Sequence, residues 1–170
     1  MRVVVAVVAV VVIVASYLTW TAGRLDRLHA RVDAAEASLD AQLLRRSVAA
    51  EALPRSLVGS RTESLRAAAR AARNADTSGR EAVENDLSRL LSQLVLPRGT
   101  PVLAELELAV GRVSLARQFY NDAVRDTRSV RFKPLVRLLR LAGHRAMPTY
   151  FEIDDAGLTG DGSYHERQRP

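Results

Sequence analysis

The chain has 170 residues, of which 48% are hydrophobic, 26% charged and only 5% aromatic, and its formal net charge is +6. The absence of cysteine excludes a disulfide scaffold, a cysteine-ligated zinc site and a thiol nucleophile. The length is that of one domain with a real hydrophobic core, and the few aromatic residues argue against a β-sandwich or an aromatic-lined sugar cleft.

The N-terminal stretch predicts a membrane anchor. No residue from Val3 to Gly23 is charged, and the first thirteen of them are valine, alanine or isoleucine. About 20 such residues in a helix span the hydrocarbon layer of a bilayer. Tyr17 and Trp20 stand at one end, where aromatic residues anchor a span. The alternative, a cleaved signal peptide, requires a shorter apolar core and a better cleavage site. We therefore predict a transmembrane helix over residues 1–22.

Arginines flank the C-terminal side of this segment more than its N-terminal side. Arg24, Arg27 and Arg31 follow it, whereas only Arg2 precedes it. Under the positive-inside rule, which ignores nearby acidic residues, the flank richer in arginine stays in the cytoplasm. The sequence therefore predicts a single-pass protein of the cell membrane with a cytoplasmic C-terminal body.

Beyond Gly23 the apolar residues recur at the three- and four-residue spacing of an amphipathic helix. Pro54 is expected to end this first helix near Leu53, because proline lacks the N–H needed for the next backbone hydrogen bond. No linker separates the amphipathic part from the apolar stretch, so we expect one continuous rod. The stripe consists of Leu25, Leu28, Val32, Ala35, Leu39 and Leu43.

The next two helices are predicted from composition, spacing and helix-terminus residues. An alanine-rich helix covers 55–75, and the loop after it contains a capping box from Ser78 to Glu81. The third helix follows this box and ends at Pro97–Gly99. Its apolar side consists of Val83, Leu87, Leu90, Leu91, Leu94 and Val95.

The fourth helix begins at Thr100 and Pro101, a good N-cap residue and a residue favoured at the first helical position, and ends near Arg128. Short connections favour an all-α fold in which the body, residues 23–151, is an antiparallel four-helix bundle. The fourth helix then returns towards the membrane. Its stripe consists of Leu103, Leu106, Val110, Val113, Phe119 and Val124, widened by Leu108 and Leu115.

The closing segment, residues 130–151, is basic. Its first sixteen residues hold no acidic side chain and five basic ones, Arg131, Lys133, Arg137, Arg140 and Arg145. Leu135, Leu138, Leu139 and Ala142 share one helical face. One interpretation is that these apolar residues close the core and the basic ones are solvated. The other is that the five basic residues contact lipid head groups. The glycine-rich acidic remainder, 152–170, predicts a flexible tail.

Three strings near the C-terminal end are distinctive. They are Arg-Gln-Phe-Tyr-Asn-Asp-Ala-Val at 117–124, Phe-Lys-Pro at 132–134 and Met-Pro-Thr-Tyr-Phe-Glu at 147–152. The first resembles the signature in the last long helix of the LemA family, and the other two are similar to the closing segment of that family. At Glu36, where tryptophan is usual, the chain departs from the pattern, so it resembles a divergent member. The resemblance implies one N-terminal anchor and a long-helix bundle, without a family-wide reaction. The signature and packing residues are Arg117, Phe119, Tyr120, Asn121, Asp122, Phe132, Pro148, Tyr150 and Phe151.

Five aromatic residues are expected to gather at the membrane-proximal end of the body. The spacing places Phe119 on the core stripe, with Tyr120 and Asn121 at its edge. One interpretation is an aromatic plug that locks the closing segment onto the fourth helix. The other is a small ligand pocket with Asn121 and Arg117 as polar contacts. The five aromatic residues are Phe119, Tyr120, Phe132, Tyr150 and Phe151.

The sequence lacks the patterns of common catalytic and binding sites. His29, His144 and His165 are scattered, and no glycine-rich phosphate loop, zinc-protease motif, nucleophile elbow or calcium loop is present. The arginines are spread without interleaved aromatic residues, which argues against nucleic-acid binding. We therefore expect no enzyme, cofactor or metal, and we expect the lipid bilayer and unidentified proteins as partners.

These observations favour a membrane-anchored scaffold or adaptor. Two alternatives stay open: a peripheral regulator that binds anionic lipid through residues 131–145, and a bundle that senses a small ligand near Tyr120.

Overall fold

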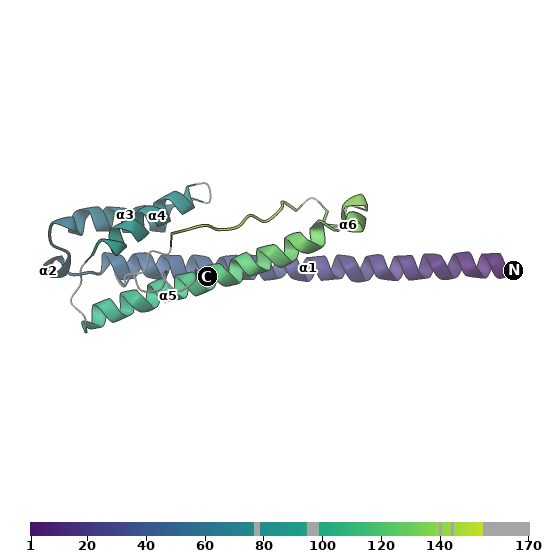
Figure 1. Ribbon diagram of the computed structural model, residues 1–170, viewed down its shortest axis with the longest axis horizontal. Coiled ribbons are helices and arrows are strands. Elements are labelled where there is room, and N and C mark those ends of the chain that lie inside the picture. The colour runs from purple at the N-terminus through teal and green to yellow at the C-terminus, as the bar shows by residue number, and fades with distance from the viewer. Residues whose placement is uncertain (77–78, 95–98, 140, 144, 155–170) are drawn as a thin grey trace, which may run out of the picture. The chain divides into compact units, whose positions relative to one another are not determined.

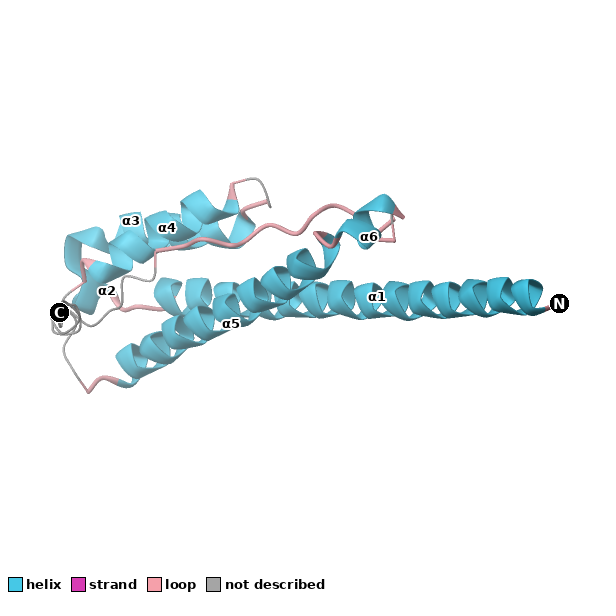
Figure 2. Cartoon of the chain, turned by 45° about the vertical axis from the view of Figure 1, so that its right-hand side comes forward, coloured by secondary structure: helices cyan, strands magenta, loops and turns pink. Residues whose placement is uncertain are grey.

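The computed structural model of the protein describes residues 1–76, 79–94, 99–139, 141–143 and 145–154 (Figure 1). All regular secondary structure in these ranges is helical, as predicted (Figure 2). The elements are α1 (Arg2–Glu51), α2 (Arg55–Val58), the 3₁₀ helix η1 (Gly59–Arg61), α3 (Thr62–Asn74), α4 (Arg80–Ser92), α5 (Pro101–Arg131) and α6 (Pro134–Leu138).

α1 is a single helix of 50 residues that joins the apolar stretch to the amphipathic part without a break, as predicted (Figure 1). Its N-terminal part is long and apolar enough to cross a membrane, and none of its most apolar window is buried by the rest of the protein. The hydroxyl groups of Thr19 and Thr21 donate to the backbone carbonyls of Ala15 and Tyr17, at 2.9 and 2.8 Å. These bonds satisfy the hydroxyl donors within the helix itself, as an apolar surrounding requires.

The chain divides into two compact units. The first unit comprises Met1–Ala37 and Gln118–Tyr150, and the second comprises Ser38–Arg117 and Phe151–Pro170. Each unit has its own cluster of buried apolar side chains, and α1 and α5 contribute residues to both.

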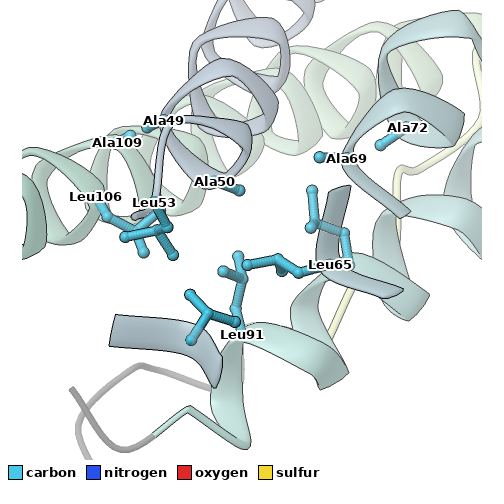
Figure 3. Close-up of a cluster of buried hydrophobic side chains, with 11 residues drawn as sticks. Ala49, Ala50, Leu53, Leu65, Ala69, Ala72, Leu91, Leu106 and Ala109 are labelled. Atoms are coloured by element: carbon cyan, nitrogen blue, oxygen red, sulfur yellow. The ribbon is translucent and has the colours of Figure 1, made fainter. Parts of the chain in front are cut away.

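The core of the second unit is built from leucines and alanines of α1, α3, α4 and α5 (Figure 3). Alanines on α1, α3 and α5 permit close approach of the helices, while the leucines supply most of the apolar area removed from water. Its buried members are Ala49, Ala50, Leu53, Val58, Leu65, Ala69, Ala72, Leu87, Leu91, Leu106 and Ala109.

Ion pairs at the surface of the second unit join α1 to its neighbours. Glu51 accepts hydrogen bonds from the side chains of Arg70 and Arg73, at 3.0 and 2.8 Å. The hydrogen bond from Arg70 is the main reason that the pKa of Glu51 lies below its ordinary value. Arg80 pairs with Asp40 at 2.5 Å, which links α4 to α1.

The predicted single helix over 55–75 is wrong, because the chain is broken into α2, η1 and α3. Gly59 has a φ of 64°, in the left-handed region that a regular right-handed helix does not use. Thr62 then begins α3, and its hydroxyl donates to the carbonyl of Gly59 at 2.7 Å. The glycine therefore turns the chain before the alanine-rich helix starts.

The start of α4 also differs from the predicted capping box. Its N-cap residue is Gly79, without a side-chain cap, and the N–H of Gly79 donates to Asp76 Oδ1 at 3.1 Å. Glu81, the other half of the predicted box, accepts the backbone N–H of Glu152 instead. Ser78, Val95, Pro97 and Arg98 lie outside the described residues.

α5 runs three residues beyond its predicted end, and its buried face matches the predicted stripe in part, because Leu103, Leu106, Val113 and Val124 are buried as predicted. Phe119 is 58% exposed, and Leu108 and Leu115 are exposed too, so their placement on the core stripe is wrong. The buried residues recur every three to four positions through small side chains that a search for large apolar residues passes over. They are Leu103, Leu106, Ala109, Val113, Ala116, Tyr120, Ala123, Val124, Thr127 and Val130.

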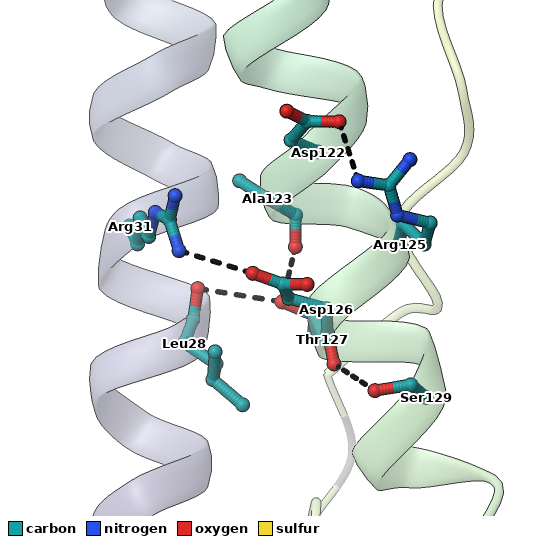
Figure 4. Close-up of polar contacts among 8 residues, drawn as sticks. All are labelled: Leu28, Arg31, Asp122, Ala123, Arg125, Asp126, Thr127 and Ser129. Atoms are coloured by element: carbon teal, nitrogen blue, oxygen red, sulfur yellow. Dashed lines mark hydrogen bonds and ion pairs between the residues drawn. The ribbon is translucent and has the colours of Figure 1, made fainter.

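In the first unit, the C-terminal part of α5 packs on α1 just beyond its apolar stretch (Figure 4). Leu25 clusters with Val130 and Val136, all of them buried. Arg31 pairs with Asp126 at 3.1 Å across the two helices. Within the first unit, the C-terminal part of α5 therefore lies beside the part of α1 that follows the apolar stretch.

Candidate functional site

α6 and the residue that follows it present three leucines outward. Lys133 has an extended backbone conformation and Pro134 occupies the first turn, so α6 begins directly after the N-cap residue. Val136 is buried against Leu25, whereas Leu138 is 78% exposed. Leu135 and Leu139 are exposed as well, so the interpretation that these three leucines close the core is wrong. Only Ala142 of the predicted face packs against the buried cluster.

The predicted lipid-contact residues fall into different environments. The guanidinium group of Arg131 donates to the carbonyls of Ala146 and Arg145, at 2.7 and 2.8 Å. Arg145 pairs with Asp33 at 3.3 Å. Lys133 and Arg137 are exposed, and neither has a hydrogen bond or ion pair from its side chain to another described residue. Arg140 lies outside the described residues. Of the described members of the predicted set, Lys133 and Arg137 are therefore the ones whose cationic groups are free.

His29 is a buried residue that the sequence analysis treated as scattered. Its Nδ1 lies 2.9 Å from the carbonyl oxygen of Leu25, and its Nε2 lies 3.3 Å from Nη1 of Arg131. The carbonyl can only accept and the guanidinium can only donate, so the neutral ring with the proton on Nδ1 satisfies both contacts. His29 thus orients Arg131, which in turn holds the chain at Arg145 and Ala146.

Two of the five aromatic residues, Phe132 and Tyr150, lie beside an arginine rather than in a buried plug. The guanidinium carbon of Arg128 lies 5.7 Å from the ring centroid of Phe132 and 5.4 Å from that of Tyr150. Both rings are exposed on their other sides, and Arg128 also donates to the carbonyl of Pro148 at 3.1 Å. Tyr120 is buried, and its hydroxyl donates to the carbonyl of Thr149 at 2.9 Å. The prediction of a buried plug is therefore wrong, because most of these rings are exposed. Hydrogen bonds from Arg128 and Tyr120 nevertheless hold residues 148–150 on α5.

A small cavity of about 440 Å³ lies beside Tyr120 in the first unit. Its lining is mainly polar or charged, and Arg117 and Asn121 are not part of it. Asp122 pairs with Arg125 at 2.7 Å along the surface of α5. The polar contacts predicted for a ligand pocket are therefore not brought together. The lining includes His29, Asp33, Glu36, Tyr120 and Arg145.

The segment after Tyr150 continues along α4 of the second unit. The backbone N–H of Glu152 donates to Glu81 Oε1 at 3.0 Å, and that of Asp154 donates to Asn85 Oδ1 at 2.7 Å. Ile153 is buried and Phe151 is half-buried. Residues 152–154, which the predicted tail includes, are therefore held against α4, and the rest of the predicted tail lies outside the described residues.

The second unit contains a buried ion pair that was not predicted from the sequence. Arg46 pairs with the carboxylate of Glu84, and their side chains are 3% and 1% exposed. The same guanidinium donates to Ser88 Oγ at 3.0 Å and to the carbonyl of Glu84 at 3.3 Å. The signal was present, because Arg46 continues the spacing of Leu39 and Leu43 on the core stripe.

An open groove lies between α1 and α5 in the second unit. Its volume is about 720 Å³, and its walls carry the exposed side chains of Leu44, Val48 and Leu108. Arg45 and Arg112 line it from opposite helices. Arg45 contacts only Gln42, at 3.4 Å, and neither arginine has an ion-pair partner among the described residues. Glu105 lines the groove as well, so its charged residues are two arginines and one glutamate. The groove thus combines an apolar wall with a net positive charge.

Within the described parts of the chain, no three His, Asp or Glu side chains gather in a way that could hold a metal ion. Comparison of the sequence with protein-family models and with curated proteins, and of the structure with solved structures, gave no match.

Proposed function

We propose that this protein is a single-pass membrane-anchored adaptor. In this proposal residues 1–22 cross the bilayer, and the body is an antiparallel four-helix bundle on the cytoplasmic side, in a divergent member of the LemA family. The observation that carries the proposal is α1, which begins as an exposed apolar helix and continues without a break into a packed body.

The residues at the end of the apolar stretch support the anchor. Tyr17 and Trp20 lie with their ring centroids 6.4 Å apart, and both are exposed. The guanidinium carbon of Arg24 lies 5.8 Å from the ring centroid of Trp20. An aromatic belt followed by arginines is the arrangement found where a span leaves the hydrocarbon layer for the head groups.

The groove between α1 and α5 supports the adaptor role, and its proposed occupant is an amphipathic helix of a partner protein with acidic residues beside its apolar face. Helix-in-groove recognition uses apolar anchors spaced at three and four residues, which Leu44, Val48 and Leu108 would contact. Acidic flanks would pair with Arg45 and Arg112, which have no such partner among the described residues.

A second copy of the chain fits the groove less well. Two chains anchored in one bilayer are related by an axis along the membrane normal, so each chain presents the same patch to the other. Such a contact would place the same patch, with two arginines and one glutamate, on both sides of the interface, and patches of like net charge repel. Charge complementarity therefore favours an acidic partner helix.

Binding of a designed helix tests the adaptor proposal. The probe is a fluorescent peptide of about 18 residues with leucine at heptad spacing and glutamate on both flanks, and its control carries lysine in place of glutamate. With the full chain in neutral nanodiscs, we expect the acidic peptide to bind roughly tenfold more tightly than the basic one. Arg112→Glu should abolish this preference, and Leu108→Ser should weaken the binding of both peptides.

The matched control for this experiment is Leu138→Ser, an exposed leucine of the first unit that is not part of the groove. Equal affinity for the two peptides, or unchanged binding by the Leu108→Ser variant, would refute the groove as the docking site. Dimerisation of the full chain that Leu108→Ser abolishes would show that a second copy occupies it.

A further inference from the structure

We infer that the exposed surface of α6 and the residue pair before it is a second membrane contact, which rests in the head-group layer of an anionic bilayer. This lipid-facing surface consists of Phe132, Lys133, Leu135, Arg137, Leu138 and Leu139. The inference rests on the proposed membrane anchor, and it adds a lipid-composition preference that an anchor alone does not have.

Packing on α1 determines the depth of this surface. Leu25 stands two residues after Gly23, where the uncharged stretch ends, so it lies only about 3 Å further along the helix. Leu25 belongs to the same buried cluster as Val130 of α5 and Val136 of α6. Because the polar layer of a bilayer leaflet is several ångströms thick, α6 is carried at the level of the head groups if the uncharged stretch spans the hydrocarbon.

The apolar part of the surface is unusual for a helix that faces water. Val136 is the one buried residue of α6, while Leu135 and Leu138 point outward and are exposed. Leu139 and Phe132 extend this exposed apolar area on either side of the helix. Contiguous exposed apolar side chains rimmed by charge mark a protein or membrane contact in soluble domains.

The charges favour an anionic bilayer over a protein partner. Lys133 and Arg137 are one helical turn apart and have no side-chain partner among the described residues. No aspartate or glutamate occurs between Asp126 and Glu152. Each cation beside an anionic leaflet contributes about fivefold to the partition. Because the proposed anchor keeps this surface beside the bilayer, the local concentration of lipid around it is high. Lipid is therefore favoured over a protein that would have to diffuse to it.

The arginines that are already engaged hold this surface in place. Arg131 bonds to the carbonyls of Arg145 and Ala146, and Arg128 bonds to that of Pro148. These hydrogen bonds hold residues 145–148 against α5. The chain is therefore attached to α5 both before α6, through the helix itself, and after it. The lipid contact is therefore assigned to Lys133 and Arg137 rather than to all five predicted basic residues.

Fluorescence quenching in proteoliposomes tests this inference. Because the chain has no cysteine, Leu138→Cys gives a single site for an environment-sensitive dye, and Ala67→Cys, an exposed position on α3, gives the control site. With spin-labelled lipid head groups as quenchers, we expect at least threefold stronger quenching at position 138 than at position 67. In vesicles with about 30% anionic lipid, the quenching at 138 should exceed that in neutral vesicles.

The charge-reversed variant Lys133→Glu with Arg137→Glu should return the quenching at 138 to its level in neutral vesicles, while alkaline carbonate still fails to extract the chain. Equal quenching at 138 and 67 with carbonate-resistant protein would overturn the lipid contact and leave the anchor standing. Extraction of the unmodified chain by carbonate would overturn the anchor itself. A shielded dye that lipid quenchers do not reach would show that protein covers the surface, which also overturns the inference.

Discussion

Replacing Glu84 with alanine is expected to lower the free energy of unfolding of the second unit by about 3–5 kcal/mol. The change leaves the guanidinium of Arg46 buried without its carboxylate, and a buried charge that loses its partner cannot recover its hydration. Ser88 and the carbonyl of residue 84 still accept from Arg46, but neither carries a neutralising charge. Chemical denaturation of the full chain, followed by circular dichroism, measures the loss.

The matched control is Asp86→Ala, two residues away on α4. Asp86 also pairs with an arginine, Arg89, but both side chains are exposed, so we expect its loss to cost under about 1 kcal/mol. The double variant Arg46→Leu with Glu84→Leu removes both charges and should recover most of the stability lost in Glu84→Ala. Similar losses for Glu84→Ala and Asp86→Ala would contradict the buried ion pair.

Leu25→Ala is expected to destabilise the first unit by about 2–4 kcal/mol, because it removes a fully buried leucine and leaves a cavity. The same leucine is the contact between α1 and Val136, so its loss should also release α6. Hydrogen exchange of the full chain in nanodiscs would report both effects, as faster exchange in residues 130–139.

Leu44→Ala serves as the control for this measurement, since Leu44 is an exposed leucine on the same helix. It should change neither the exchange of residues 130–139 nor the stability by more than about 0.5 kcal/mol. If Leu25→Ala left the exchange of residues 130–139 unchanged, Leu25 would not be what positions α6.

The N-terminal half of the fold follows from sequence because its signals are local and consistent. The uncharged stretch is long enough to span a bilayer as a helix, and the stripe from Leu25 to Leu43 has helical spacing. Pro54 stops the helix close to the predicted place. The break at Gly59 was missed because a single glycine does not reveal from sequence alone whether it adopts the left-handed conformation.

The predicted stripe of α5 is correct at Leu103, Leu106, Val113 and Val124 but wrong at Phe119, for a different reason. The prediction gave weight to large apolar residues, which placed Phe119 inside, whereas the helix buries Ala116, Tyr120 and Ala123. Alanine has a low hydrophobicity, so a hydrophobicity scale does not predict that it is buried. Its small size allows two helices to approach closely, and helix packing therefore buries it. Tyr120 can be buried because the backbone carbonyl of Thr149, 29 residues away in sequence, accepts a hydrogen bond from its hydroxyl group.

The candidate sites were predictable only in part. The charge pattern of the sequence locates the exposed basic surface. It does not show which of the basic residues are paired and which are free, because the partners of Arg131 and Arg145 lie on other segments. The pairing of Arg46 with Glu84 needs two helices to meet, although charges of opposite sign at core positions were a usable hint. The groove depends on which face of α5 is left uncovered, and that required its register.

Chemical labelling of single cysteines in intact cells tests the anchored topology most directly, because the chain has no cysteine of its own. The three positions are Val3, Val12 and Ser60, labelled with a membrane-impermeant maleimide. We expect Val3→Cys to react from outside, Val12→Cys to react from neither side, and Ser60→Cys to react only after the membrane is opened. Reaction of Val12→Cys in intact membranes, or of Val3→Cys and Ser60→Cys from the same side, would contradict a span across the bilayer.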